Sequence, residues 1–104
     1  MDREEGEEDM LSFTVRMRFS SEDRQEVEGM LRELTAASRQ EPGCVNYVPH
    51  FVEGEAATVL IYEQYKDEAG LEQHRNSPHF KKYAVGGLYQ KMLGRDMENL
   101  TAIC

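Results

Sequence analysis

Tryptophan is absent from this chain of 104 residues, and cysteine occurs only twice, as Cys44 and Cys104. The two cysteines lack the spacing of a metal site, and a single disulfide is of little use in a reducing compartment. No segment approaches the roughly 18 consecutive apolar residues of a membrane span, and the N-terminus lacks a signal peptide's apolar stretch. Glycine-rich phosphate loops and serine-hydrolase motifs are also missing. We therefore expect a cytoplasmic protein without a membrane partner.

Basic residues are outnumbered by acidic ones, 12 to 20, which gives a formal net charge of -8. Six acids and one base fall in residues 1–9, where apolar side chains are almost lacking. We predict a disordered acidic tail there and one globular domain over residues 10–104. In the domain the bases are interspersed with acids, which argues against nucleic-acid binding.

The spacing of apolar residues predicts four strands and two helical regions. The predicted order is a strand at 11–19, a helix at 21–40, strands at 44–51 and 57–65, helices at 68–75 and from Ser77 to Gly86–Gly87, and a strand at about 93–103. This β-α-β-β-α-β order indicates an α+β, ferredoxin-like fold: a split βαβ antiparallel sheet with helices on one face. Val45, Tyr47 and Phe51 are expected to share one face of the second strand.

The other face of the sheet needs a cover, because the third strand carries apolar residues on both sides. Leu60 and Tyr62 alternate there with Val59 and Ile61. Packing against the sheet of a second copy buries such a face with two-fold symmetry. We therefore expect a homodimer.

Several short motifs occur in order: EPGCVNY at 41–47, and IYEQYKDEAGLEQHRNSPHF at 61–80. Through these motifs the chain resembles the antibiotic biosynthesis monooxygenase domain family. The resemblance extends over roughly residues 11–103. Its members share a Pro-Gly-small entry to the second strand, a Tyr-Glu strand end, and a His followed by Ser-Pro-His-Phe. Where the family often has tryptophan, two residues after the strand-end glutamate, this chain has Tyr65.

The resemblance implies a dimeric α+β barrel, with a pocket between sheet and helices in each protomer. There several members oxidise phenolic or quinol-like molecules with molecular oxygen and without metal or flavin. The family also includes an isomerase and haem-degrading enzymes, so membership alone does not fix the reaction.

Glu63 lies in register with Val59, Ile61 and Tyr65, which places a carboxylate on an apolar face. A buried carboxylate needs a partner, and His74 is the expected one. The pair is either a catalytic base with its orienting carboxylate or a structural link between helix and strand.

His79 follows Pro78 in the first turn of a helix, where the dipole favours a neutral imidazole. It either binds substrate or fixes the Ser-Pro turn. His74 and His79 are five residues apart across a helix break, without a third close ligand, so we expect no metal. The aromatic residues Tyr47, Tyr65, Phe80 and Tyr83, with Asn46 at the same end of the sheet, are candidates for a substrate pocket, although aromatics at this spacing are commonly core.

The leading hypothesis is a cofactor-independent monooxygenase that oxidises a phenolic, quinol or polycyclic aromatic small molecule with molecular oxygen. His74 is the base and Glu63 orients it, while His79 and Tyr65 bind the substrate's oxygen atoms. The alternatives are an isomerase or tautomerase that uses the same base without oxygen, and a non-catalytic dimeric ligand-binding module.

Overall fold

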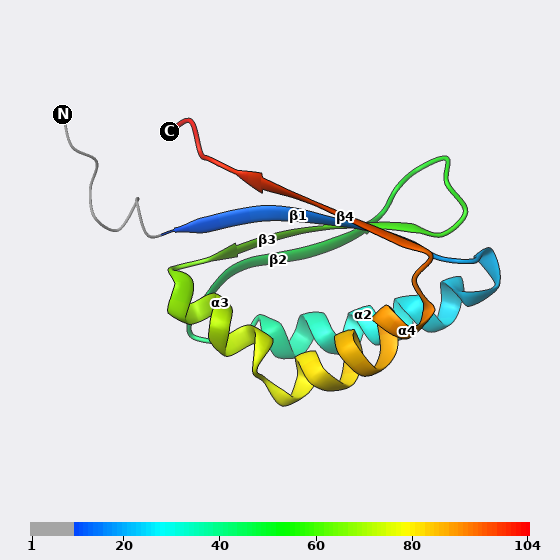
Figure 1. Ribbon diagram of the computed structural model, residues 1–104, viewed down its shortest axis with the longest axis horizontal. Coiled ribbons are helices and arrows are strands. Elements are labelled where there is room, and N and C mark those ends of the chain that lie inside the picture. Colours follow the sequence, from blue (N-terminus) through cyan, green and yellow to red (C-terminus); the bar gives the residue numbers. More distant parts are fainter. Residues whose placement is uncertain (1–9) are drawn as a thin grey trace.

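A single antiparallel sheet with helices on one face forms the molecule (Figure 1). The computed structural model describes residues 10–104, and the predicted acidic tail at 1–9 lies outside the described residues. The strand order is β2-β3-β1-β4. The elements are β1 (Leu11–Arg18), the 3-10 turn η1 (Ser21–Asp23), α2 (Arg24–Ser38), β2 (Cys44–Phe51), β3 (Thr58–Tyr65), α3 (Glu68–Arg75), the π-helix η2 (Phe80–Leu88), α4 (Tyr89–Lys91) and β4 (Gly94–Leu100). The predicted ferredoxin-like fold is confirmed.

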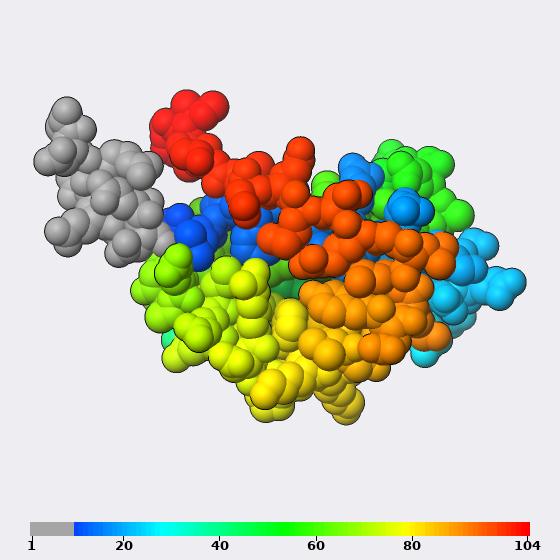
Figure 2. Space-filling view, in the orientation of Figure 1, coloured from blue at the N-terminus to red at the C-terminus, as the bar shows by residue number. Residues whose placement is uncertain are grey.

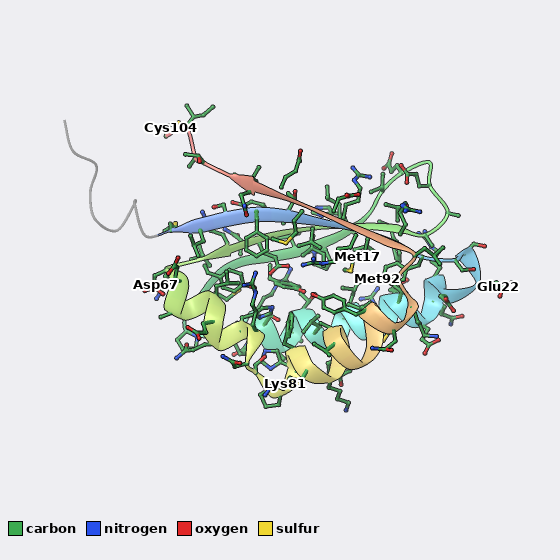
Figure 3. All side chains as sticks on the ribbon, in the orientation of Figure 1. Met17, Glu22, Asp67, Lys81, Met92 and Cys104 are labelled. Atoms are coloured by element: carbon green, nitrogen blue, oxygen red, sulfur yellow. The ribbon has the colours of Figure 1, made fainter. Side chains whose placement is uncertain are left out.

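The two central strands supply the sheet's share of the core. β1 and β3 pair antiparallel, with Phe13 opposite Glu63 and Val15 opposite Ile61. Alternation turns Phe13, Val15 and Met17 toward the helices, and Met17 lies between the sheet and the helical layer (Figure 3).

The first helix begins and ends close to its predicted bounds. The Ser20 hydroxyl accepts a hydrogen bond from the Glu22 amide at 3.3 Å, which caps the 3-10 turn that leads into α2. Val27, Leu31 and Leu34 recur at helical spacing and are buried against the sheet. Among the described residues, no helix is both long and apolar enough to span a membrane.

The second helical region is capped twice, because the chain breaks between α3 and η2. Asp67 accepts from the Gly70 amide at 2.8 Å, and Ser77 accepts from the Phe80 amide at 3.2 Å. The expectation that the glycines at 86 and 87 end the helix is wrong, since η2 runs through them into α4. A Cβ on Gly87 would lie 2.6 Å from the sulfur of Met30, so this glycine lets η2 pack closely on α2.

Strand β2 departs from simple alternation at its start. The register with β3 shifts between Cys44 and Asn46, which is a bulge. Val45 is therefore exposed, contrary to the expected common face, while Tyr47 is buried. The bulge brings Tyr47 back to the inner face.

The entry to β2 touches the start of α3 through two glycines. A Cβ on Gly43 would lie only 2.6 Å from the Cα of Gly70, and one on Gly70 would lie 3.1 Å from the Cα of Gly43. Because these neighbours are backbone atoms, no side-chain rotation can relieve the clash. The glycine in the EPG motif is thus required by backbone packing.

We predict that Gly43→Ala lowers the free energy of unfolding by about 1–3 kcal/mol, since the added methyl group forces the two backbones apart. Gly29→Ala is the control, because a Cβ there meets nothing within 4 Å and lies in the interior of α2. It should be stabilising by about 0.5–1 kcal/mol. Urea denaturation of both variants measures the difference, and equal stability of the two would contradict the packing argument.

Candidate active site

Glu63 is a buried carboxylate on the helix-facing side of β3. Only 6% of its surface is exposed, as the alternation of the strand predicted. Its Oε1 accepts a hydrogen bond from the Tyr65 hydroxyl at 2.7 Å. Tyr65 is itself fully buried, with its ring stacked against Phe13. Tyr65 thus holds Glu63 in place.

His74 is paired with Glu41, which differs from the predicted Glu63 partner. The Nδ1 of His74 lies 3.0 Å and 3.2 Å from the two carboxylate oxygens of Glu41. Its Nε2 lies 4.0 Å from Oε1 of Glu63, which is beyond hydrogen-bond distance. α3 therefore turns one edge of the ring toward the turn before β2 and the other toward Glu63.

His79 hydrogen-bonds through Nε2 to the same Glu41 oxygen that faces His74. The rings of His74 and His79 are 6.2 Å apart between centroids, so the break between α3 and η2 brings both histidines to one carboxylate. Glu41, His74 and His79 form what we call the Glu41 cluster. His50 lies apart, on the exposed edge strand.

Burial shifts the titration of the two central groups in opposite directions. Burial raises the pKa of Glu63 to about 7, against the opposing effect of the Tyr65 hydrogen bond and of Arg75 and Arg95. Burial lowers the pKa of His74, against the opposing effect of Glu41. The His74 ring is therefore neutral at neutral pH. Because an ionised carboxylate only accepts, Nδ1 of His74 carries the proton and Nε2 has a free lone pair.

A small cavity lies between the sheet and the helices, and His74 is part of its lining. Its volume is about 30 Å³, close to that of one water molecule. The lining is apolar apart from Glu63, His74, two tyrosines and two arginines, and comprises Phe13, Val15, Met17, Leu34, Tyr47, Ile61, Glu63, Leu71, His74, Arg75, Phe80, Ala84, Leu88, Tyr89 and Arg95. The site thus joins a base, a carboxyl group and an apolar surface.

The candidate substrate-binding residues divide into those that line this cavity and those that do not. Tyr47 and Phe80 line it, whereas His79, Tyr65 and Tyr83 do not. Asn46 is exposed and donates to Gln64 Oε1 at 2.8 Å, away from the cavity. The β-strand alternation that turns Tyr47 inward turns Asn46 outward.

The Glu41 cluster is the group of described residues that could hold a metal ion. One ligand atom from each of its members lies within 4.8 Å of the others. Two imidazoles and a carboxylate are a donor set that zinc and iron accept, and Glu41 is the third ligand that the sequence did not indicate. In this structure both imidazoles hydrogen-bond to the carboxylate. A metal-free site stays a prediction.

Sequence reasoning missed Glu41, Arg75 and Arg95 as residues of the site. Glu41 lies 33 residues from His74, and no local periodicity links the two. The available signal was its place at the head of the EPG motif, one of the segments that carry the family resemblance.

We predict that Glu63→Gln flattens the pH dependence of stability. The pKa of Glu63 is higher in the folded protein than its ordinary value of 4.5, so its protonated form contributes stability that is complete below that value and lost as the pH rises through about 7. Between about pH 5 and pH 8 the wild type should lose roughly 2–3 kcal/mol of unfolding free energy relative to the variant. Urea titrations across this range measure it. Glu72→Gln, on the exposed side of α3, should leave the slope unchanged; parallel curves for wild type and Glu63→Gln would refute the assignment.

Comparison with known proteins places the chain in a family. Residues 10–85 match the model of the antibiotic biosynthesis monooxygenase family. A Bacteroides thetaiotaomicron structure, provisionally named an antibiotic biosynthesis monooxygenase, is 28% identical, with a TM-score of 0.87 over 95% of this chain and 94% of that one. A Pseudomonas aeruginosa structure is 26% identical, with a TM-score of 0.84 over 92% and 96%. An uncharacterized Synechocystis protein is 24% identical over 78 residues, which are 75% of this chain. The match covers about half (53%) of the length of that protein. The chain belongs to the antibiotic biosynthesis monooxygenase family.

Proposed function

We propose that this protein is a monooxygenase that oxidises a phenolic or quinol-type aromatic small molecule with molecular oxygen, without a cofactor. The observation that carries the proposal is the orientation of His74. Glu41 holds Nδ1, Nε2 has no hydrogen-bond partner among the described residues, and His74 is part of the lining of a largely apolar cavity. A neutral imidazole held in this way is a general base.

The reaction begins when Nε2 of His74 takes the proton of a substrate hydroxyl. The imidazolium that forms is stabilised by Glu41, which accepts the Nδ1 hydrogen bond. The electron-rich substrate anion then reduces oxygen. For a quinol, one oxygen atom enters the ring as a hydroxyl group, the other leaves as water, and the substrate is oxidised to the hydroxyquinone. The substrate supplies all the electrons.

Apolar side chains give the reaction a dry setting. Phe13, Met17, Leu34 and Phe80 line the cavity, and these can cover an aromatic ring on both sides. A cavity of about 30 Å³ does not hold such a ring, so binding requires the cover formed by η2 and α3 to move. The same small volume is what favours the rival function, a dimeric module without catalytic activity.

Isotopically labelled oxygen tests the proposal with a panel of quinols and chelator-treated protein. We expect label in the hydroxyquinone and a loss of at least ~100-fold in kcat for His74→Ala. His50→Ala, outside the cluster, should behave as wild type. Full turnover in a double variant, His74→Ala with His79→Ala, would refute the proposed roles of both histidines, and equal turnover without oxygen would favour an isomerase or tautomerase.

Glu41→Gln separates a catalytic from a structural role for the Glu41 cluster. The amide oxygen can still accept from Nδ1, so the ring keeps its orientation, but the negative charge that favours the imidazolium is lost. We expect a lower kcat and an acid limb of the pH–rate profile displaced to lower pH. A variant with lower stability but an unmoved profile would assign Glu41 to folding alone.

The homodimer remains a proposal, supported by the uncovered face of the sheet. All helices lie on one side (Figure 1), and Leu60 and Tyr62 on the other side are only half-buried. Sedimentation should give twice the 12.0 kDa of the chain. Tyr62→Glu should produce monomers and Arg32→Glu, on the exposed side of α2, should not; a wild-type monomer would disprove the dimer. A cytoplasmic location likewise stays a prediction.

A further inference from the structure

Two arginines from distant parts of the chain line the cavity that holds Glu63 and His74. Arg75 is the last residue of α3, next to His74, and Arg95 is the second residue of β4. Both are exposed, so they form the outer part of the lining while Glu63 and His74 form the inner part. Figure 2 shows the face on which strand atoms are visible in a recess between α3, in yellow-green, and β4, in orange-red.

Neither arginine is engaged by an oxygen acceptor among the described residues. By contrast, Arg24 and Arg39 donate to the carbonyl oxygens of Ala56 and Tyr47, and Arg32 donates to Glu28. Arg95 donates only to the sulfur of Met97, at 3.2 Å, which is a weak acceptor that an anion can replace.

Arg95 packs against the cavity lining although no oxygen acceptor pairs with it among the described residues. Its guanidinium carbon lies 5.5 Å from the ring centroid of Tyr89, another residue of the cavity lining. β4 pairs Arg95 with Met17, so the side chain lies on the helix-facing side of the sheet. A planar donor group is therefore held at the mouth of the cavity before a ligand arrives.

Glu63 is the acidic residue of the cavity lining, and among the described residues it forms no ion pair with either arginine. Its Oε1 accepts instead from the Tyr65 hydroxyl at 2.7 Å. On the outer side of Arg75, a hollow of about 440 Å³ is lined by Glu68 and Glu72 as well. An anion is repelled from that hollow, which leaves the side of the mouth toward Arg95.

We propose that the substrate of this site carries a carboxylate or similar anionic group, which Arg95 and Arg75 bind at the mouth while the aromatic ring enters the apolar cavity. The reacting hydroxyl is at the other end of the molecule, beside Nε2 of His74. The placement of the reacting hydroxyl rests on the proposed function. The binding of an anionic group rests on the two arginines alone.

Calorimetric titration with a hydroxynaphthoic acid and with its neutral primary amide tests the binding. Neither probe needs to turn over. The acid should bind at least ~10-fold more tightly, because a charge-assisted hydrogen bond replaces a neutral one. Raising the salt concentration should weaken the binding of the acid and leave the binding of the amide unchanged.

Variants at the mouth assign the preference to these residues. Arg95→Gln and Arg75→Gln should each weaken binding of the acid roughly 3- to 30-fold without affecting the amide, and Arg95→Lys should restore part of the loss. Arg32→Gln, on the outer side of α2, is the matched control and should bind both probes as wild type.

Equal affinity for acid and amide, absence of binding, or an equal loss for both probes in the arginine variants would overturn the inference. Oxygen incorporation into a naphthoquinol carboxylate is measured separately. If the acid binds through the arginines but no labelled oxygen enters the product, the monooxygenase proposal fails and the anionic ligand class stands.

Discussion

The Glu41 carboxylate, bound by two imidazoles, is the interaction on which the site depends. It joins the turn before β2 to His74 on α3 and to His79 at the start of η2 (Figure 1). The two histidines lie 33 and 38 residues from Glu41 in the sequence. A carboxylate that is largely removed from water requires such donors. Once they are in place, the ring of His74 has one possible tautomer and one edge directed at the cavity.

Burial disfavours the charged forms of both His74 and Glu63, so the two groups do not form a close ion pair. The sequence suggested a direct pair of the two, either a catalytic base with its orienting carboxylate or a structural link, since a histidine and a carboxylate were both expected near one apolar surface. Burying two charges there is costly, and the 4.0 Å gap between Nε2 and Oε1 does not compensate for it. The interior instead favours the protonated acid and the unprotonated imidazole, and the unprotonated imidazole is the form that accepts a proton from a third molecule.

The fold was predictable because its signals are local. Alternation in residues 11–19 and 57–65 marks two strands, and Ser20, Asp67 and Ser77 mark three helix starts, each within four residues of the amide it caps. The continuation of η2 through two glycines was not predictable, because it depends on Met30 in another helix. The same division holds for the site. Glu63 is conspicuous on its own strand, whereas the bond between Glu41 and His74 exists only once β2 and α3 have come together.

The contact between Gly43 and Gly70 has a consequence for motion. α3 rests backbone to backbone on the start of β2 near its N-terminal end, where Asp67 also caps it, while His74, which is bound to Glu41, and Arg75 lie at the other end beside the cavity. If α3 widens the space beneath it by pivoting about the two glycines, the displacement is smallest at the glycines and largest at Arg75. The bond between His74 and Glu41 then limits how far the helix moves.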